Sequence, residues 1–296
     1  MEILFLGTGS MAPTKERNHN GILLRHGSEG ILLDCGEGTQ RQLKIAGIRP
    51  NQISKILITH WHGDHSLGLP GLVQTLGMSE YNRNLRIFGP KGTKEKIELL
   101  KRVFIAEERL KYDVEDIDKK RFYDGEDFYL EALPLEHGTS CLGYSFVEKE
   151  KRKMKTDVIK KLGIPEGPLI GKLQRGESIH FNGKTIKPDD VSSIVKGRKV
   201  TFIADTLPCR NAVVLAENSD LLICEATYAH ELEEKAREYR HMTARQAALI
   251  ASQSGAKKLV LTHFSPRYKT TEKIEEDARD VFDNAICAKD FMKIKL

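Results

Sequence analysis

Short apolar runs closed by glycine or polar residues recur along the first half of the chain, and each is typical of a buried β-strand. These runs are residues 3–6, 22–24, 31–33, 56–58 and 85–88. The segments between several of them have apolar residues at helical spacing. The expected helices are residues 39–46, 67–76 and 93–104. Strand and helix alternate in this half, which predicts an α/β fold.

The second half continues the alternation, with further strands expected at residues 128–133, 142–147, 200–203, 221–224 and 259–261. A late helix shows both of its end signals, because Thr243 can cap its first turn and Gly255 can end it. Ala247, Ala248, Ile250 and Ala251 form its apolar face. Two sheets faced with helices would accommodate these elements, and we expect one domain over residues 1–296.

One stretch, residues 148–195, interrupts this regular order. It begins with the run Lys149-Glu150-Lys151-Arg152-Lys153 and continues into a segment rich in glycine and proline around Gly167-Pro168. Glycine and proline at this density disfavour regular structure, so we expect a basic helix followed by an irregular tip. The stretch should be an arm inserted into the domain and should rejoin it before Val200.

Charge is concentrated in the same stretch. The chain carries a formal charge of +5. Residues 149–175 hold nine Lys or Arg and three Asp or Glu, a local charge of +6, so the rest of the chain, with 38 basic and 39 acidic residues, has a charge of −1. A localised basic segment indicates a polyanionic partner more than a general property of the fold.

Composition places the chain among folded cytoplasmic proteins. Hydrophobic residues make up 40% of it, and no segment has the roughly 20 apolar residues that span a bilayer or the basic leader of a signal peptide. We therefore expect no membrane association. The five cysteines are odd in number and form no C-x-x-C pair, so buried free thiols are expected in place of disulfides or a thiolate zinc site.

The densest chemistry follows the strand expected at residues 56–58. His60, His62, Asp64 and His65 lie within six residues of one another. Burying three imidazoles and a carboxylate without partners would be costly, and metal coordination removes that cost. Four ligands so close in sequence do not suit one tetrahedral ion, and hydrolytic sites recruit further ligands from distant loops. This pattern predicts a metal centre.

Candidates for the distant ligands are His137, Asp205 and His263, since each of them also follows an expected strand. Side chains at strand ends are well placed to meet at one edge of a sheet. The remaining histidines that we compared lack this setting, and we interpret them as ordinary surface or satisfied residues. They are His19, His26, His180 and His230.

The sequence H-x-H-x-D-H formed by His60, His62, Asp64 and His65 resembles the signature of the metallo-β-lactamase superfamily, and the resemblance spans nearly the whole chain. It implies an αββα sandwich. It also implies one metal on His60, His62 and His137, a second on Asp64, His65 and His263, and Asp205 as the bridge between them. Two Zn²⁺ are the expected cofactors, although these ligands also suit iron or manganese. The fold alone leaves the substrate open.

Three segments resemble the ribonuclease Z family in its short form, which matures the 3′ ends of tRNA. The first is the loop Pro13-Thr14-Lys15-Glu16-Arg17-Asn18, which matches that family's P-x-K-x-R-N pattern. In the family this loop helps to position the acceptor end of the RNA. Lys15, Arg17 and Asn18 are thus candidate substrate contacts, and an arginine can offer phosphate a bidentate fork.

The second segment pairs Cys224-Glu225-Ala226-Thr227 with His241-Met242-Thr243, which resemble the family's H-E-A-T and H-x-T motifs. By this resemblance, Glu225 and His241 deliver a proton to the leaving group, because a carboxylate can orient an imidazole and raise its pKa. Asp64 would help to hold the nucleophile. The chain departs from the pattern at Cys224, where the family has His, so a role for that ring is not carried over.

The third segment is the basic stretch, which resembles the family's protruding exosite arm. Gly167 and Pro168 match its glycine-proline tip, and Lys172 and Arg175 lie close by in the sequence. A basic element of this kind can bind the phosphate backbone of RNA by shape and charge. The implied activity is cleavage of the 3′ trailer from precursor tRNA, leaving a 3′-hydroxyl on the tRNA and a 5′-phosphate on the trailer, by a protein that is a homodimer.

Two alternatives stay open at this point. A thioesterase or lactonase of the same superfamily would share the metal motif, but it would have no use for the basic stretch or the loop of residues 13–18. A non-catalytic RNA-binding module would retain the fold without the chemistry, although all seven candidate ligands are present. Metal analysis and a comparison of thioester, lactone and precursor tRNA substrates would separate these hypotheses.

Overall fold

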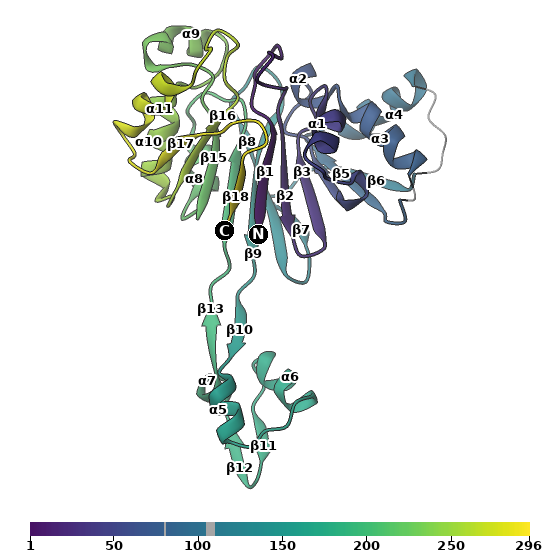
Figure 1. The fold of residues 1–296 in the computed structure, drawn as a ribbon, viewed down its shortest axis with the longest axis vertical. Coiled ribbons are helices and arrows are strands. Elements are labelled where there is room, and N and C mark those ends of the chain that lie inside the picture. Colours follow the sequence, from purple (N-terminus) through teal and green to yellow (C-terminus); the bar gives the residue numbers. More distant parts are fainter. Residues whose placement is uncertain (80, 105–109) are drawn as a thin grey trace. The chain divides into compact units, whose positions relative to one another are not determined.

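The computed structural model describes residues 1–79, 81–104 and 110–296. The chain divides into two compact units (Figure 1). The first unit consists of Met1–Asp124, Leu130–Phe146 and Lys199–Leu296. The second unit consists of Gly125–Tyr129 and Val147–Arg198. Among the residues described, no helix has both the length and the apolar character needed to cross a membrane.

The first unit contains two seven-stranded sheets, and the first sheet joins the two ends of the chain. Its strands, in spatial order, are β18 (Lys293–Lys295), β1 (Glu2–Gly7), β2 (Gly21–His26), β3 (Glu29–Leu33), β4 (Lys55–Leu57), β5 (Leu85–Gly89) and β6 (Tyr112–Asp116). β1 pairs antiparallel with both β18 and β2, whereas β3 to β6 are parallel to one another. β3 and β4 are almost wholly buried, which explains their apolar runs, whereas β6 at the border of the sheet is largely polar and only partly buried.

The second sheet is built mainly from the latter half of the chain. Its strands, in spatial order, are β17 (Ala285–Cys287), β16 (Leu259–Thr262), β15 (Leu221–Glu225), β14 (Lys199–Ile203), β9 (Cys141–Glu148), β8 (Phe128–Leu135) and β7 (Arg121–Asp124). An aromatic chain links the two sheets, since Phe122 lies 5.1 Å from Phe88 of the first sheet and 5.8 Å from Tyr144, measured between ring centroids. Tyr144 also donates a hydrogen bond to the carbonyl of Ile58.

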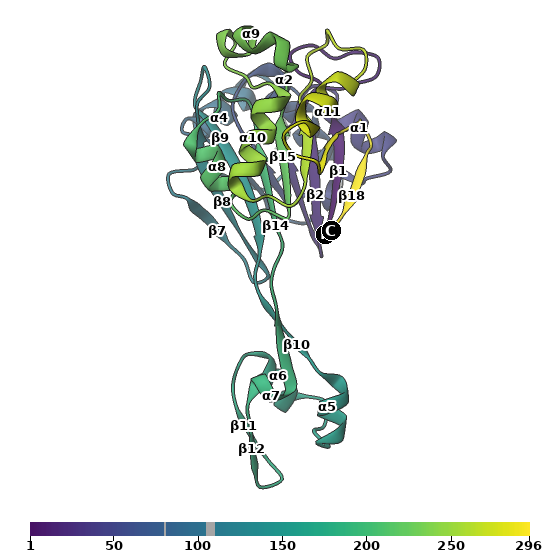
Figure 2. The same cartoon turned by 90° about the vertical axis from the view of Figure 1, so that its left-hand side faces the viewer.

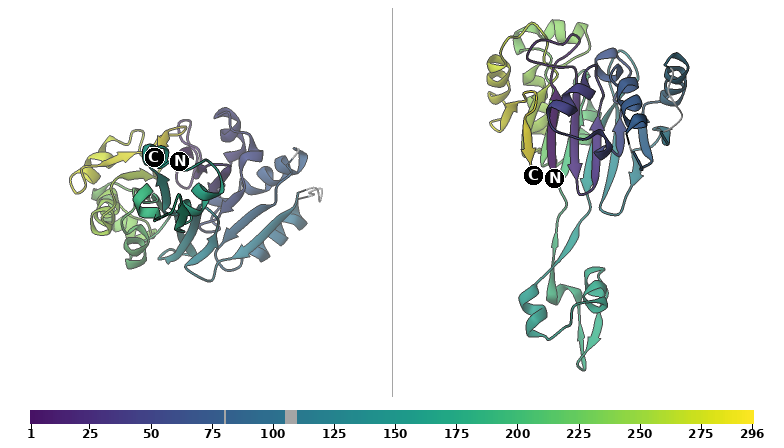
Figure 3. Two further views of the ribbon diagram at one scale, coloured as in Figure 1. Left: turned by 90° about the horizontal axis from the view of Figure 1, so that it is seen from below. Right: turned by 45° about the vertical axis from the view of Figure 1, so that its right-hand side comes forward.

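Helices cover the outer faces of both sheets in the first unit (Figures 2 and 3). Those that follow strands of the first sheet are α1 (Thr39–Ile45), α2 (Gly63–Ser66), α3 (Leu69–Met78) and α4 (Thr93–Val103). Those that follow strands of the second sheet are α8 (Arg210–Ala216), α9 (Glu233–Glu238), α10 (Ala244–Ser254) and α11 (Glu272–Arg279). Short 3₁₀ turns occur at Pro50–Gln52 and His230–Leu232. The predicted αββα sandwich is confirmed.

Helix α10 shows why a local pattern sufficed to predict it. The hydroxyl of Thr243 accepts a hydrogen bond from the backbone N–H of Gln246, and the side chain of Gln246 accepts one from the N–H of Thr243. This capping box satisfies two donors at the start of the helix. Gly255 ends the helix with a φ of 65°, a conformation that glycine adopts without steric cost.

The second unit is a small α/β assembly with its own core. Its elements are β10 (Lys151–Met154), α5 (Thr156–Lys161), α6 (Pro168–Gln174), β11 (Ile179–Phe181), β12 (Lys184–Ile186), α7 (Pro188–Val191) and β13 (Ser192–Val195). Six buried side chains form a separate apolar cluster, namely Ile159, Ile164, Leu173, Ile179, Ile186 and Val191.

Two local predictions for this stretch need correction. The basic run 151–154 is a strand, because it pairs antiparallel with β13 along its whole length, and the helix that precedes the glycine-proline segment is α5, which begins only at Thr156. The segment expected to be irregular contains helix α6, whose first residue is Pro168. Proline suits the first turn of a helix, where its missing N–H leaves no bond unmade, and Leu173 anchors the helix in the apolar cluster.

Candidate metal centre

The predicted ligands lie where strands of the two sheets end. His60 follows β4, Asp205 follows β14 and His263 follows β16. Because parallel strands end at the same edge, residues far apart in sequence meet there. His137 follows β8, and a short helix, α2, carries Asp64 and His65 back toward the strand ends. All seven predicted ligands are thereby brought together.

Four of these residues form a first group. Nε2 of His60 lies 3.0 Å from Nδ1 of His62, which lies 3.3 Å from Nε2 of His137. Oδ2 of Asp205 is 3.7 Å from Nε2 of His60 and 4.0 Å from Nε2 of His137. Four donor atoms from three separate segments therefore surround one point.

A second group lies beside the first and shares Asp205. Nε2 of His65 is 3.1 Å from Nε2 of His263, and Oδ2 of Asp64 is 3.4 Å from the same His263 nitrogen. Oδ2 of Asp205 is 3.4 Å from Nε2 of His65. The Asp205 carboxylate thus faces both groups of imidazoles.

The donor atoms fit a pair of divalent metal ions. With bonds of about 2.0–2.1 Å, the ligands of a tetrahedral zinc ion are roughly 3.3 Å apart, close to most of these spacings. Within the part of the chain that the structure describes, Oδ1 of Asp205 is buried and accepts no hydrogen bond. Nδ1 of His263 lies 3.4 Å from this oxygen. A buried carboxylate oxygen that accepts no hydrogen bond is costly, and a cation would offset that cost.

The pKa values of two candidate histidine ligands shift in opposite directions. Burial and the neighbouring imidazole of His65 lower the pKa of His60 well below its usual value, so the ring is in its neutral, metal-binding form. Burial lowers the pKa of His65, but the carboxylates of Asp205 and Asp34 outweigh burial and raise the pKa well above its usual value. A proton and a metal ion compete for this ring, which is the usual linkage at a histidine ligand.

Asp34 orients His65, and the sequence analysis did not identify it. It follows β3 with a φ of 59°, in the left-handed region that Asp adopts more readily than most residues. Its Oδ2 lies 2.7 Å from Nδ1 of His65, and the same carboxylate accepts hydrogen bonds from the N–H and hydroxyl of Thr59 and from Asn20. Such second-layer carboxylates fix the ring and its tautomer. The sequence signal that could have identified Asp34 is its position directly after a predicted strand.

Other groups orient the remaining rings. The backbone carbonyl of Arg240 lies 3.0 Å from Nδ1 of His137, and the hydroxyl of Thr227 lies 3.0 Å from Nδ1 of His263. His263 itself has a φ of 62°, which turns its ring at the end of β16. The hydroxyl of Thr59 lies 3.0 Å from Nδ1 of His60. With these partners at the Nδ1 atoms, the Nε2 atoms of the three rings face the centre.

Glu225 and His241 lie in contact beside the metal centre. Nδ1 of His241 is 3.1 Å from Oε1 of Glu225, which also accepts a hydrogen bond from the N–H of Thr206. Burial lowers the pKa of His241, but the carboxylates of Glu225 and Asp205 outweigh it and raise the pKa to about 9. His241 is also close enough to Asp205 and His263 to form a third possible ligand group. The pair can therefore hold a proton at the edge of the centre.

The loop of residues 13–18 presents its three candidate substrate contacts in different ways. Lys15 is exposed. Arg17 is buried, with a relative exposure of 8%, and donates from its guanidinium to the carbonyl of Tyr268. Asn18 uses its side chain to donate to the carbonyl of Glu37. The structure leaves Lys15 open to a ligand, whereas Arg17 and Asn18 have partners inside the protein.

The four candidate RNA contacts of the second unit lie on its surface. Gly167, Pro168, Lys172 and Arg175 are all exposed. Gly167 has a φ of 131°, which few other residues adopt, and it precedes helix α6. Arg175 lies 2.8 Å from Glu177, an exposed ion pair that adds little stability and can open toward another anion.

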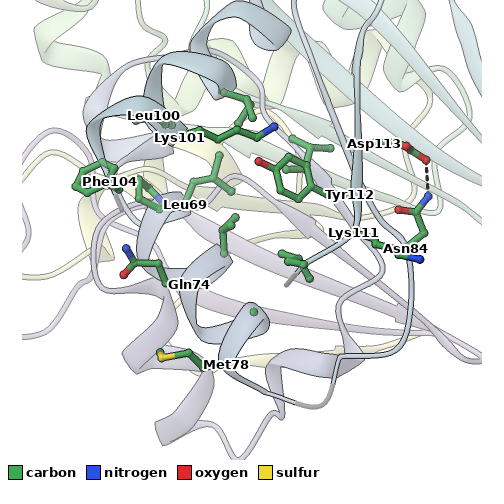
Figure 4. A pocket seen from close by; sticks show the side chains of 16 residues that line it. Leu69, Gln74, Met78, Asn84, Leu100, Lys101, Phe104, Lys111, Tyr112 and Asp113 are labelled. Carbon is green, nitrogen blue, oxygen red and sulfur yellow. Dashed lines mark hydrogen bonds between the residues drawn. The ribbon is translucent and has the colours of Figure 1, made fainter. Parts of the chain in front are cut away.

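A groove of about 1010 Å³ lies elsewhere on the first unit, between helices α3 and α4 and strand β6 (Figure 4). Its floor is apolar, with Leu69 and Leu100 among its lining residues, and Lys101 and Asp113 lie among the polar ones. It contains none of the candidate ligands, and it lacks the cluster of imidazoles and carboxylates that hydrolysis requires. The groove is therefore separate from the candidate metal centre.

Two family models match the sequence. The model described as "Beta-lactamase superfamily domain" matches residues 174–264, and the model described as "Anti-Pycsar protein Apyc1" matches residues 1–162. Full-length relatives give a more complete comparison. A "Ribonuclease Z" of Methanothermobacter thermautotrophicus is 41% identical over 297 residues, covering 100% of this chain and 97% of the relative. A "Ribonuclease Z" of Exiguobacterium sibiricum is 39% identical, with 99% of each chain covered.

Solved structures agree with these relatives. The crystal structure of human tRNase Z, short form, superposes with a TM-score of 0.74 at 30% identity, covering 100% of this chain and 99% of that one. The metallo-beta-lactamase fold protein YhfI from Bacillus subtilis superposes with a TM-score of 0.72 at 18% identity, covering 99% and 98% of the two chains. The second likeness supports the fold alone.

Proposed function

Because the chain belongs to the ribonuclease Z family, whose members are metal-dependent endoribonucleases, we propose that it uses two zinc ions to remove the 3′ trailer from precursor tRNA. The products are a tRNA ending in a 3′-hydroxyl and a trailer beginning with a 5′-phosphate. The observation that carries this proposal is the convergence of seven candidate ligand side chains with the Glu225–His241 pair at the same end of the two sheets.

Each ligand has a place in this proposal. His60, His62 and His137 would hold one ion, and Asp64, His65 and His263 would hold the other. The carboxylate of Asp205 lies close to rings of both groups and could contribute to both sites. When bound, the metals would supply Lewis-acid stabilisation of the phosphoryl oxygens and increase the acidity of a water molecule. Asp64 would hold a metal and would also help to orient the attacking water.

The Glu225–His241 pair completes the reaction at the leaving group. Water adds to phosphorus in line with the bond to the 3′ oxygen of the tRNA, and that bond breaks. The proton that the water loses passes to solvent, from which His241 is reprotonated after it has given up its own proton. Glu225 fixes Nδ1 of His241, so Nε2 is the nitrogen that gives its proton to the departing oxygen. The phosphate stays on the trailer. No 2′,3′-cyclic phosphate forms, because the 2′-hydroxyl is not the attacking group.

Substrate binding is divided between the two units. Lys15 contacts the acceptor end, and Arg17 and Asn18 fix the loop that carries it. The second unit acts as an exosite for the body of the tRNA through Gly167, Pro168, Lys172 and Arg175. Its local charge of +6 over residues 149–175 supports this role, since contacts with phosphates dominate nonspecific affinity for RNA. We further propose that the protein acts as a cytoplasmic homodimer, which light scattering at micromolar concentration would test.

An end-labelled precursor tRNA gives a direct test. The protein should release one trailer fragment with a 5′-phosphate, and a chelator should abolish the release until Zn²⁺ is restored. A thioester and a lactone, assayed in parallel, should be turned over poorly. Recovery of a cyclic phosphate on the tRNA, or preference for the thioester or lactone, would be incompatible with the proposal.

A further inference from the structure

A loop between β1 and β2 touches the metal centre through its backbone. We call residues 8–18 the N-terminal loop. The N–H of Met11, in this loop, donates a hydrogen bond of 2.8 Å to Oδ2 of Asp64. This is the same oxygen that lies 3.4 Å from Nε2 of His263. The position of the loop therefore affects the orientation of one candidate ligand.

The carboxylate of Asp290 accepts hydrogen bonds from both ends of this loop. Its Oδ1 accepts a hydrogen bond of 2.8 Å from the hydroxyl of Thr8, at the start of the loop. Its Oδ2 accepts one of 2.8 Å from the backbone N–H of Asn18, at the end of the loop. Gln42 of helix α1 donates to the same Oδ2 at 3.1 Å. The carboxylate thus closes the loop with charge-assisted hydrogen bonds, which are stronger than neutral ones.

Asp290 is itself held in place by strand β1. The next residue, Phe291, donates its N–H to the carbonyl of Phe5, and Phe5 donates its own N–H to the carbonyl of Met292. Phe291 has a φ of 67°, so the chain turns sharply just after Asp290. The anchor therefore has a fixed position in the first sheet, although it lies far from the loop in sequence.

We propose that Asp290 is a positioning residue for the metal centre: its carboxylate holds both ends of the N-terminal loop and thereby holds the Met11 N–H against Asp64. The inference rests on the proposed role of Asp64 as a ligand. Backbone hydrogen bonds from Gly9 to Asn18 and from Ser10 to Phe264 also close the loop. Loss of the carboxylate should for this reason loosen the loop without unfolding the sheet.

The test compares Asp290→Ala and Asp290→Asn with the wild-type protein. Hydrogen exchange followed by mass spectrometry reports on the amides of residues 8–18, and competition with a chelating dye reports on affinity for Zn²⁺. Asp290→Ala should speed exchange in this loop and weaken the binding of the weaker Zn²⁺ by about 10-fold or more, the scale of second-layer effects on metal sites. Asp290→Asn should have an intermediate effect, because its amide oxygen can still accept from one end of the loop.

Two further variants keep the inference testable. Thr8→Val removes one donor while keeping the shape of a buried side chain, so it should reproduce part of the effect even if Asp290→Ala fails to fold. Asp283→Ala removes an exposed aspartate from the same part of the chain and should match the wild type in both measurements. Neither readout uses RNA, so the result is independent of whether the wild-type protein cleaves precursor tRNA. Unchanged exchange in residues 8–18 and unchanged Zn²⁺ affinity in Asp290→Asn and Thr8→Val would overturn the inference.

Discussion

Nδ1 of His241 lies 3.1 Å from Oε1 of Glu225, and this carboxylate is fixed on its other oxygen by the hydroxyl and N–H of Thr227. An imidazole held in this way keeps its proton and presents it in one direction. The pair is rigid because Glu225 closes a buried strand of the second sheet. Mutation of His241 can distinguish a role as proton donor from a role as metal ligand beside Asp205 and His263.

His241→Ala should reduce single-turnover cleavage of precursor tRNA by about 10²- to 10⁴-fold, the usual contribution of a general acid. Metal content, measured by mass spectrometry of the protein-bound metal, and RNA affinity should be unchanged. His230→Ala is a suitable control, since His230 is an exposed histidine on a 3₁₀ turn. Loss of metal from His241→Ala would instead assign this residue to the ligand group that it can form with Asp205 and His263.

His263→Ala should show the opposite profile. Removing its ring leaves Asp64 and His65 as the unshared ligands of the second ion, so the zinc content should fall from about two to about one per chain. Cleavage should be lost together with the metal and should not return at millimolar Zn²⁺. His230→Ala again serves as the control, because His230 is exposed and lies outside the second unit. Retention of both ions by His263→Ala would contradict the ligand assignment.

The second unit can be shortened without cutting its strand pair. Lys155 and Val191 are joined by a backbone hydrogen bond just beyond β10 and β13, so a glycine-serine turn can replace residues 155–191. Hydrolysis of a small phosphodiester and zinc content should be retained, because no candidate ligand is removed. Precursor tRNA should bind more weakly, and the dependence of log Kd on log salt should become shallower by roughly 0.7–0.9 for each phosphate that the shortened protein no longer binds.

Two outcomes would contradict the prediction for the shortened protein. If the shortened protein lost zinc and small-phosphodiester hydrolysis together, the second unit would be required for the integrity of the first. If it kept the full salt dependence of tRNA binding, the residues that bind RNA would lie elsewhere.

Acid should weaken the fold through Glu29. Burial raises the pKa of this carboxyl, but hydrogen bonds from Lys55 and Ser54 outweigh burial, and the pKa lies below its ordinary value of 4.5. A lowered pKa contributes stability above the unfolded value, and that stability is lost as the pH falls through the folded value. Glu29→Gln should therefore lower the free energy of unfolding by about 1 kcal/mol at pH 7. Urea titrations of the metal-free protein should show this difference shrinking below about pH 4.

Central strands were predictable because burial on both faces requires apolar side chains at successive positions. β4 and β16 are fully buried and mostly apolar, and their ends pointed to His60 and His263. Edge strands carry no such mark: β18 is a single buried isoleucine between two exposed lysines, and it was missed. The basic strand β10 was predicted as a helix. This prediction failed because the pairing of β10 with β13, and not its own sequence, determines its conformation.

The same distinction applies to the site. Spacing revealed His60, His62, Asp64 and His65, since ligands close in sequence form a recognisable motif. Asp34 could not be found in this way, because its function comes from lying 2.7 Å from His65, a contact between distant parts of the chain. Arg17 has the charge expected of a phosphate contact, and its burial became visible only in three dimensions.

The pairing of β1 with β18 sets an order of events during synthesis. β1 is made first among the described strands and β18 last, yet Glu2, Ile3 and Leu4 pair with residues of β18. Until that late segment leaves the ribosome, β1 has an open edge that could associate with another nascent chain. The first sheet is therefore completed only after the segment that contains β18 has been synthesised, and the β1–β2 loop acquires its anchor, Asp290, shortly before that segment. A translational pause before residue 285 should yield a chain that already contains every candidate ligand but retains zinc poorly.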